Sequence, residues 1–309
     1  MNIIEKIPIP VSGLILSLFS LGNLLQDIHP HLRYLFGAIG AIFLILMILK
    51  VIFYPNSIKN DFKNPVIVSS SGTFSMSLMI LSTYIAPFTP LFAYGIWIVG
   101  IVLHIMLMIY FTYRFIIRDF DINAVYPSYW IVFVGITMGA ITANIHGITE
   151  IDFIFFTIGF VSMLVTTPLI IYRYIKYPNI PDMNKPLVCI FTALFSILIV
   201  GYVNSADIIS NTFLITLYTI ACAFYMFALF KFISYRNLDF YPSFSAFTFP
   251  FVISALATKG IVAKISNVNF ILNSILTIET IIAVFLVVYV MIRYIKFFKN
   301  SKKVEINST

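Results

Sequence analysis

Long apolar stretches alternate with short polar breaks along nearly the whole chain. A helix needs about 20 predominantly apolar residues to cross the hydrocarbon core of a bilayer. The pattern predicts ten such helices, at residues 9–26, 33–54, 65–86, 90–113, 127–148, 152–175, 186–204, 208–235, 242–259 and 268–296. We therefore expect an all-α integral membrane protein with one ten-helix transmembrane domain, residues 1–299, and a short cytoplasmic tail at 300–309.

The polar breaks form two sets that differ in basic residues. One set, taken with both ends of the chain, holds all but three of the 19 Lys and Arg residues. The exceptions are Arg33, Lys259 and Lys264. Because cytoplasmic loops carry the positive excess, we expect a multi-pass protein of the cell membrane with both termini in the cytoplasm. This orientation requires an even number of crossings, and the predicted number, ten, is even.

A proline opens every odd-numbered segment. The five are Pro10, Pro65, Pro127, Pro186 and Pro242, at spacings of 55, 62, 59 and 56 residues. Proline is favoured in the first turn of a helix, where its missing N–H would be unpaired anyway. No even-numbered segment opens in the same way, and the nearest case is Pro90 at the start of the fourth segment. The regular spacing predicts a helical hairpin repeated five times.

Small and hydroxyl residues concentrate in the odd-numbered segments, whereas the second and fourth segments are apolar on all sides. The third segment begins with Ser69-Ser-Ser-Gly-Thr73, and the first carries Gly13, Ser17 and Ser20. Such residues either allow close helix packing or line water, and the pattern leaves both interpretations open. Together they predict that the odd helices lie inside, around a central pore, and the even helices outside.

The shared proline places the five inner segments in a common register. Seven residues beyond it, or about 10 Å of helix, lie Ser17, Gly72, Val134, Ala193 and Phe249. Four of these side chains are small or modest and one is large. The register therefore predicts a narrow pore obstructed by Phe249. Chance is the alternative, because the chain contains 32 Phe residues.

The ninth segment opens with an unusual mixture, Tyr241-Pro-Ser-Phe-Ser-Ala-Phe-Thr-Phe-Pro-Phe251. A proline inside a membrane helix frees a backbone carbonyl, which must find a partner in protein or water. This favours a place at the pore for Thr248, Phe249 and Pro250. Gly13 and Gly135 are further candidates for the pore wall.

Composition supports a membrane location. The chain is 61% hydrophobic and 10% charged, whereas soluble domains carry about 25% charged residues. A net charge of +7 could suggest nucleic acid, but the one-sided distribution of the basic residues favours the lipid bilayer. Cys189 and Cys222 lack the spacing of a disulfide framework or a metal site. We expect no nucleic-acid partner, no cofactor and no metal.

Catalytic clusters are missing from the sequence pattern, so we expect no enzyme. His104 lies near the middle of the fourth segment, and Glu279 is the one acidic residue well inside a segment. Ionisable groups at membrane depth are costly and are candidates for function. For both residues, a helix contact and a role in proton coupling remain open.

The chain resembles the tellurite-resistance/dicarboxylate transporter family, which includes bacterial TehA proteins and plant slow-type anion channels. The resemblance rests on the length, the ten segments, Pro-x-Pro before Ser12, Tyr-Pro-Ser-Tyr at 126–129, and above all Phe247-Thr-Phe-Pro250. It implies an uncharged pore of odd helices, occluded by an aromatic residue that corresponds to Phe249. Phe247 is the alternative if the register slips by two. A homotrimer with one pore per protomer is also implied.

The expected function is a channel for small inorganic anions such as chloride or nitrate. An uncharged pore fits conduction, because a ring of Lys or Arg would bind anions too tightly for rapid release. The alternative is a proton-coupled carrier for C4-dicarboxylates such as malate, linked to tellurite resistance and dependent on His104 or Glu279. A membrane scaffold without ion flux is a third class. Pro250 is the only mid-membrane proline of an odd segment, which leaves the pore diameter open.

Overall fold

The computed structural model describes residues 4–265 and 270–306, with side chains described up to residue 299. Within these ranges the chain is helical and has no β-strand. The elements are α1 (Val11–Leu25), α2 (Pro30–Phe53), α3 (Pro55–Asp61), α4 (Pro65–Ile85), α5 (Pro90–Phe111), η1 (Thr112–Arg118), η2 (Ile122–Ala124), α6 (Ser128–Phe133), α7 (Thr137–Ala143), η3 (Asn144–His146), α8 (Asp152–Lys176), η4 (Asp182–Cys189), α9 (Ile190–Ser205), α10 (Asn211–Tyr235), η5 (Pro242–Phe247), α11 (Phe249–Lys264) and α12 (Phe270–Ile306). The predicted domain and tail also include residues 1–3, 266–269 and 307–309, which lie outside the described residues.

Eight stretches of the described chain are long and apolar enough to cross a membrane. They are α2, α4, α5 with η1, α8, η4 with α9, α10, η5 with α11, and α12 as far as Lys299. Two of the ten predicted segments differ. The first, α1, is apolar but only 15 residues long, and the fifth is divided into α6 and α7. The prediction of an all-helical membrane protein is confirmed.

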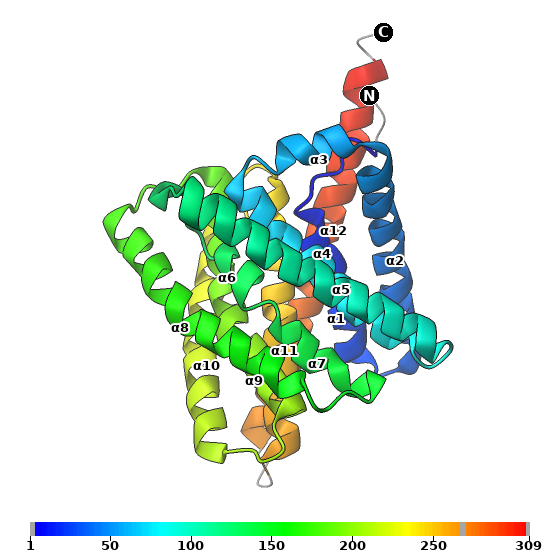
Figure 1. Cartoon of the computed structure of the whole chain (residues 1–309), viewed down its shortest axis with the longest axis vertical. Helices are drawn as coiled ribbons and strands as arrows, with labels where there is room; N and C mark the ends of the chain where they lie inside the picture. The colour runs from blue at the N-terminus through cyan, green and yellow to red at the C-terminus, as the bar shows by residue number, and fades with distance from the viewer. Residues whose placement is uncertain (1–3, 266–269, 307–309) are drawn as a thin grey trace.

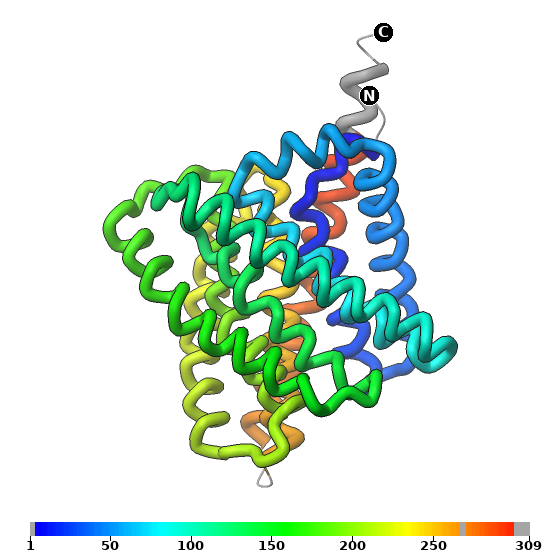
Figure 2. Tube along the Cα trace, in the orientation of Figure 1, coloured from blue at the N-terminus to red at the C-terminus, as the bar shows by residue number. Residues whose placement is uncertain are grey.

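The long helices fall into two groups by burial. Within the most apolar 18 residues of each helix, the buried share is 72% in α4, 89% in η4–α9 and 72% in η5–α11. The corresponding share is only 28–33% in α2, α5–η1, α8, α10 and α12. Every residue of α1 except Asn23 is buried. Figure 2 shows α2 and α10 at opposite edges of the molecule, with α5 and α8 crossing in front.

The buried helices contact one another in a closed ring. α1 contacts α4, α4 contacts α6 and α7, α7 contacts α9, α9 contacts α11, and α11 contacts α1. Each also contacts the exposed helix that follows it in the chain: α2 on α1, α5 on α4, α8 on α7, α10 on α9 and α12 on α11. We call the first group the inner helices and the second group the outer helices.

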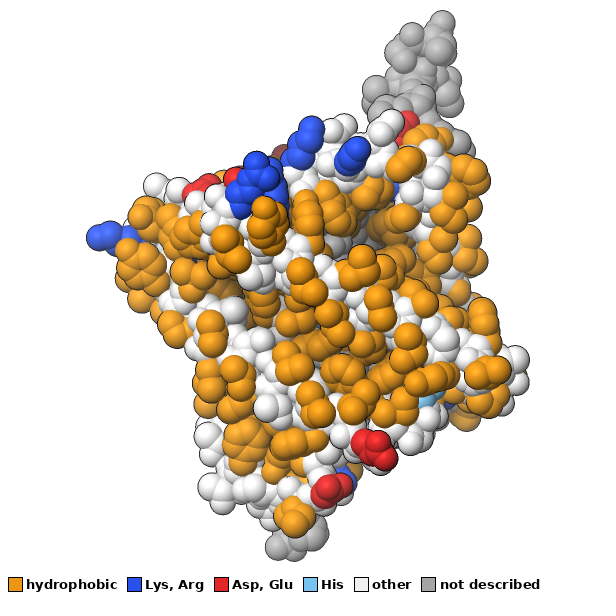
Figure 3. All heavy atoms as spheres, viewed as in Figure 1, with side chains coloured by type: hydrophobic (Ala, Val, Ile, Leu, Met, Phe, Trp, Pro, Cys, Tyr) orange, Lys and Arg blue, Asp and Glu red, His pale blue; other side chains and the backbone are white. Residues whose placement is uncertain are grey.

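Charged and apolar surfaces are separated. In Figure 3, hydrophobic side chains cover the broad middle of the visible face, and most of the visible Lys and Arg side chains gather near its upper end. The chain enters α1 and leaves α12 at this same end (Figure 1). An apolar belt of this kind is the surface that a membrane protein presents to lipid.

Prolines open outer helices as well as inner ones. Pro30 is the first residue of α2, and Pro90 is the first residue of α5. The expected contrast, with Pro90 as the nearest even-numbered case, is therefore not found, because an opening proline does not distinguish the odd-numbered helices from the even-numbered ones. The physical reason is that the first turn of any helix tolerates a residue without an N–H.

The helix that contains Pro250 is interrupted before that residue. η5 ends at Phe247, Thr248 has non-helical φ and ψ of −110° and −81°, and α11 begins at Phe249. Pro250 is thus in the first turn of a new helix, where its missing N–H leaves no broken hydrogen bond. The sequence pattern suggested a proline within one helix, whereas the structure has a proline that begins one.

Candidate pore and gate

A cavity of about 60 Å³ lies among the inner helices. Its walls come from α1, α4, α6 with the two residues that follow it, η4–α9, and η5–α11. None of the 19 lining residues is charged. The five inner segments therefore share one uncharged space, to which each contributes.

The lining residues recur at one helical face of four inner segments. Four residues after the opening proline lie Ile131, Ile190 and Ala246. Seven or eight residues after it lie Thr73, Val134, Gly135, Ala193, Leu194, Phe249 and Pro250. Eleven residues after it lie Met76 and Ile197. Because a helix turns every 3.6 residues, these offsets share a face.

Sequence reasoning considered one level of this wall and missed the others. Met76, Ile131 and Ile197 line the cavity but were not among the predicted residues. The signal that could have found them is the same helical period, carried one turn before and one turn after the position seven residues beyond each proline.

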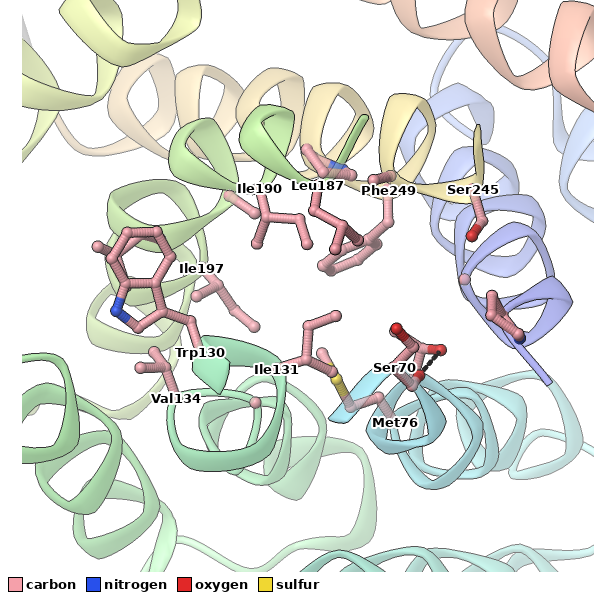
Figure 4. A pocket seen from close by; sticks show the side chains of 18 of the residues that line it. Ser70, Met76, Trp130, Ile131, Val134, Leu187, Ile190, Ile197, Ser245 and Phe249 are labelled. Carbon is pink, nitrogen blue, oxygen red and sulfur yellow. Dashed lines mark hydrogen bonds between the residues drawn. The ribbon is translucent and has the colours of Figure 1, made fainter. Parts of the chain in front are cut away.

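Phe249 lies in the wall of the cavity and is 7% exposed. Figure 4 shows Leu187 and Phe249 reaching into the space from one side, and Ile131 and Met76 from the opposite side. Large apolar side chains therefore converge from separate inner segments on the middle of the cavity.

Phe247, two residues earlier, has a different environment. It is fully buried, and its ring centroid lies 5.1 Å from that of Phe244 and 5.2 Å from that of Phe232. It is not one of the residues that line the cavity. The two Phe side chains of the Phe-Thr-Phe motif thus point to different sides of their segment.

Six of the predicted pore residues meet around the cavity: Gly13, Val134, Gly135, Ala193, Phe249 and Pro250. Ser17, Gly72 and Thr248 lie in contacts between helices. The Ser17 hydroxyl donates to Thr248 Oγ1 at 2.6 Å. A Cβ atom at Gly72 would lie 3.0 Å from Ile131 Cγ2 and 3.2 Å from Leu107 Cδ2.

Hydroxyl side chains bond neighbouring inner helices to one another. The pairs are Ser12 with Thr73 at 2.7 Å, Ser69 with Ser128 at 2.7 Å, Ser254 with Thr192 and Ser196 at 3.0 Å each, and Ser17 with Thr248 at 2.6 Å. At the remaining junction, the amide of Asn144 donates to the Asn204 carbonyl at 2.5 Å. The sequence left open whether the small and hydroxyl residues pack helices together or line water. The residues named here join helices.

His104 and Glu279 both bond to neighbouring helices and do not line the cavity. Buried His104 donates through Nε2 to the Val132 carbonyl at 3.1 Å, and its Nδ1 lies 2.7 Å from Ser75 Oγ. Glu279 on α12 accepts a hydrogen bond from Thr258 of α11 at 2.5 Å. Each side chain therefore links an inner helix to an outer one.

An all-helical chain with an apolar belt, and with an uncharged cavity among its inner helices, has the features of a membrane channel or transporter. The family described as SLAC1, voltage-dependent anion channel, matches residues 7–295. The chain belongs to this family, which confirms the resemblance found in the sequence.

One curated relative is an uncharacterized transporter from Methanocaldococcus jannaschii. It is 26% identical over 197 residues, which cover 60% of this chain and 58% of the relative. The match thus spans less than two thirds of the relative's length.

Proposed function

We propose that the protein is a channel for small inorganic anions, with Phe249 as its gate. Ten helices cross the membrane as five hairpins, the inner helices surround the pore, and both termini are cytoplasmic. The observation that carries the proposal is the position of Phe249 in an uncharged cavity to which all five inner segments contribute. The homotrimer implied by the family resemblance is part of the same proposal.

The direction of the inner helices favours anions. In the hairpin arrangement, all inner helices start at the basic end of the molecule. The N-terminus of a helix carries a partial positive charge, so several aligned N-termini attract anions to that mouth. The surrounding Lys and Arg residues raise the local anion concentration, while the uncharged wall beyond them binds ions weakly enough to release them.

The uncharged wall explains closure at Phe249, because no charged side chain among the lining residues replaces the water around an ion. An apolar ring across such a space blocks conduction by steric closure and dewetting. Movement or truncation of the Phe249 side chain would open the path.

Recordings from purified protein in planar bilayers test the gate. We expect Phe249→Ala to raise the anion current at least about tenfold, because it removes the ring that blocks the cavity. Phe247→Ala is the matched control: it truncates a neighbouring Phe packed away from the cavity, and its current should stay near that of the wild type. A correctly inserted Phe249→Ala protein with unchanged current would contradict the gate.

Gradients of chloride, nitrate and malate in the same recordings test the transport class. A channel gives currents that reverse near the anion's equilibrium potential and do not saturate at low concentration. A proton-coupled dicarboxylate carrier shows saturation and counterflow, and its flux requires His104 or Glu279. Absence of any anion flux in both Phe variants and the wild type would reject the channel.

A further inference from the structure

A second, polar pocket lies behind α11, between the inner helices α9 and α11 and the outer helices α10 and α12. Its lining includes the hydroxyl groups of Ser196, Tyr218, Tyr225, Ser254 and Thr258, together with the carboxyl group of Glu279. The space is too small for a water molecule. A ligand for this pocket must therefore be small and must arrive without its hydration shell.

Glu279 has no positive partner in this pocket. It is 5% exposed, and Thr258 Oγ1 donates to its Oε2 at 2.5 Å. The titratable groups that line the pocket beside it are Tyr218, Cys222 and Tyr225 of α10; α9 and α11 contribute only hydroxyl and Ala side chains, and none of the lining residues is Lys, Arg or His. A buried carboxylate without a counter-charge is costly at membrane depth, so a cation that neutralises it stabilises the structure.

Tyr225 supplies an independent indication of a ligand. Its side chain is 6% exposed, its hydroxyl has no hydrogen-bond partner in the described part of the chain, and it lines the same pocket as Glu279. Tyr218 OH lies 3.2 Å from Thr258 Oγ1, so further oxygen atoms surround the carboxyl group. Burial of an unpaired hydroxyl is unfavourable, and a bound cation would give that oxygen a partner.

The ligand set defines the charge and type of the cation. Carboxylate and hydroxyl oxygens are hard donors, which suit a proton or a hard metal ion better than a soft one. A single carboxylate balances one positive charge. We propose that this pocket binds a monovalent cation, a proton or a sodium ion, which neutralises Glu279.

The pocket is joined to the candidate gate through α11. The Ser254 hydroxyl donates to the Pro250 carbonyl at 3.1 Å, and the ring of Tyr225 lies 5.4 Å from that of Phe251 in an edge-on contact. Occupancy of the pocket therefore influences how firmly the first turn of α11, with Phe249, is held. This second step rests on the proposed function, whereas cation binding does not.

Thermal unfolding of the purified full-length protein tests cation binding. If sodium binds, the unfolding midpoint of the wild type at pH 8 is higher in sodium chloride than in choline chloride, by about 3 °C or more. If a proton binds, the midpoint in choline chloride is higher at pH 6 than at pH 8. Glu279→Gln should lose that response.

Glu150→Gln is the matched control, because Glu150 is exposed in the loop before α8, and it should respond as the wild type does. Tyr225→Phe removes one proposed oxygen ligand with little change in volume; it should weaken the response, and it serves as the second test if Glu279→Gln does not fold. A wild-type midpoint that responds to neither ion, or a response that Glu279→Gln retains in full, overturns the proposal.

Currents then test the connection to the gate. Wild-type current should change with the effective cation, and Phe249→Ala current should not, because that variant lacks the ring that α11 positions. A Phe249→Ala current that responds as strongly as the wild type overturns the connection. A midpoint response without any anion current would instead reject the channel and leave the cation site standing.

Discussion

Gly95 and Gly100 lie on the same helix, α5, in opposite surroundings. A Cβ atom at Gly100 would lie 2.9 Å from Met79 Cγ and 3.0 Å from the Ser75 carbonyl oxygen of α4. A Cβ atom at Gly95 would have nothing within 4 Å. Gly100 therefore permits the close approach of α4 and α5, whereas Gly95 has no such role.

This contrast predicts different outcomes for the same substitution. Gly100→Ala should destabilise the protein by about 1–3 kcal/mol, because the backbone of α4 must move away. Gly95→Ala should leave stability unchanged or raise it slightly, because Ala favours helix more than Gly does. Thermal unfolding in detergent measures both variants, and equal midpoints would show that the close approach is not needed.

Hydroxyl pairs hold the inner helices α1 and α4 together. The Ser12 and Thr73 oxygens lie 2.7 Å apart, so one hydroxyl donates to the other, and the accepting hydroxyl donates to a carbonyl of its own helix or turn. In a membrane, such bonds between helices contribute about 0.6–2 kcal/mol. Hydroxyl pairs occur at four of the five junctions of the inner ring, so each of these four junctions has a polar contact of its own.

A double-mutant cycle of Ser12→Ala and Thr73→Val tests one of these pairs. Each single change should lower stability, and the double variant should lose less than the sum, with a coupling of about 0.6–1 kcal/mol. Ser12→Ala combined with Ser254→Ala is the control, because no hydrogen bond joins these two residues. Additive losses for Ser12 and Thr73 would contradict the pair.

At the scale of the molecule, most Lys and Arg side chains on the face in Figure 3 gather at one end, and the chain enters α1 and leaves α12 at that end (Figure 1). This arrangement predicts that a fluorescent protein fused after Thr309 will fluoresce, because it folds in the cytoplasm. Alkaline phosphatase fused after Ile208, in the exposed loop between α9 and α10, should be active outside. The reverse pattern would contradict the orientation.

Much of the architecture could be predicted from the sequence, and the bilayer is the reason. Every backbone polar group at membrane depth must be satisfied within its own helix, so an apolar stretch of sufficient length has few alternatives. Segment positions, the all-helical class and the family were predictable in this way. Of the five residues placed by the opening prolines, Val134, Ala193 and Phe249 line the cavity. In α4 the next residue, Thr73, does so, and in α1 Ser17 bonds to Thr248.

The hydrophobic pattern and the Phe-Thr-Phe-Pro motif, by themselves, determined a membrane protein of this family, and they predicted an obstructing aromatic residue in the ninth segment. Only the tertiary structure decided which Phe faces the cavity, because residues two apart lie on nearly opposite sides of a helix. The orientation of that segment depends on the break at Thr248, which bonds to Ser17 from 231 residues earlier in the chain. The rotation of a helix about its axis is fixed by such distant contacts, and no local pattern contains them.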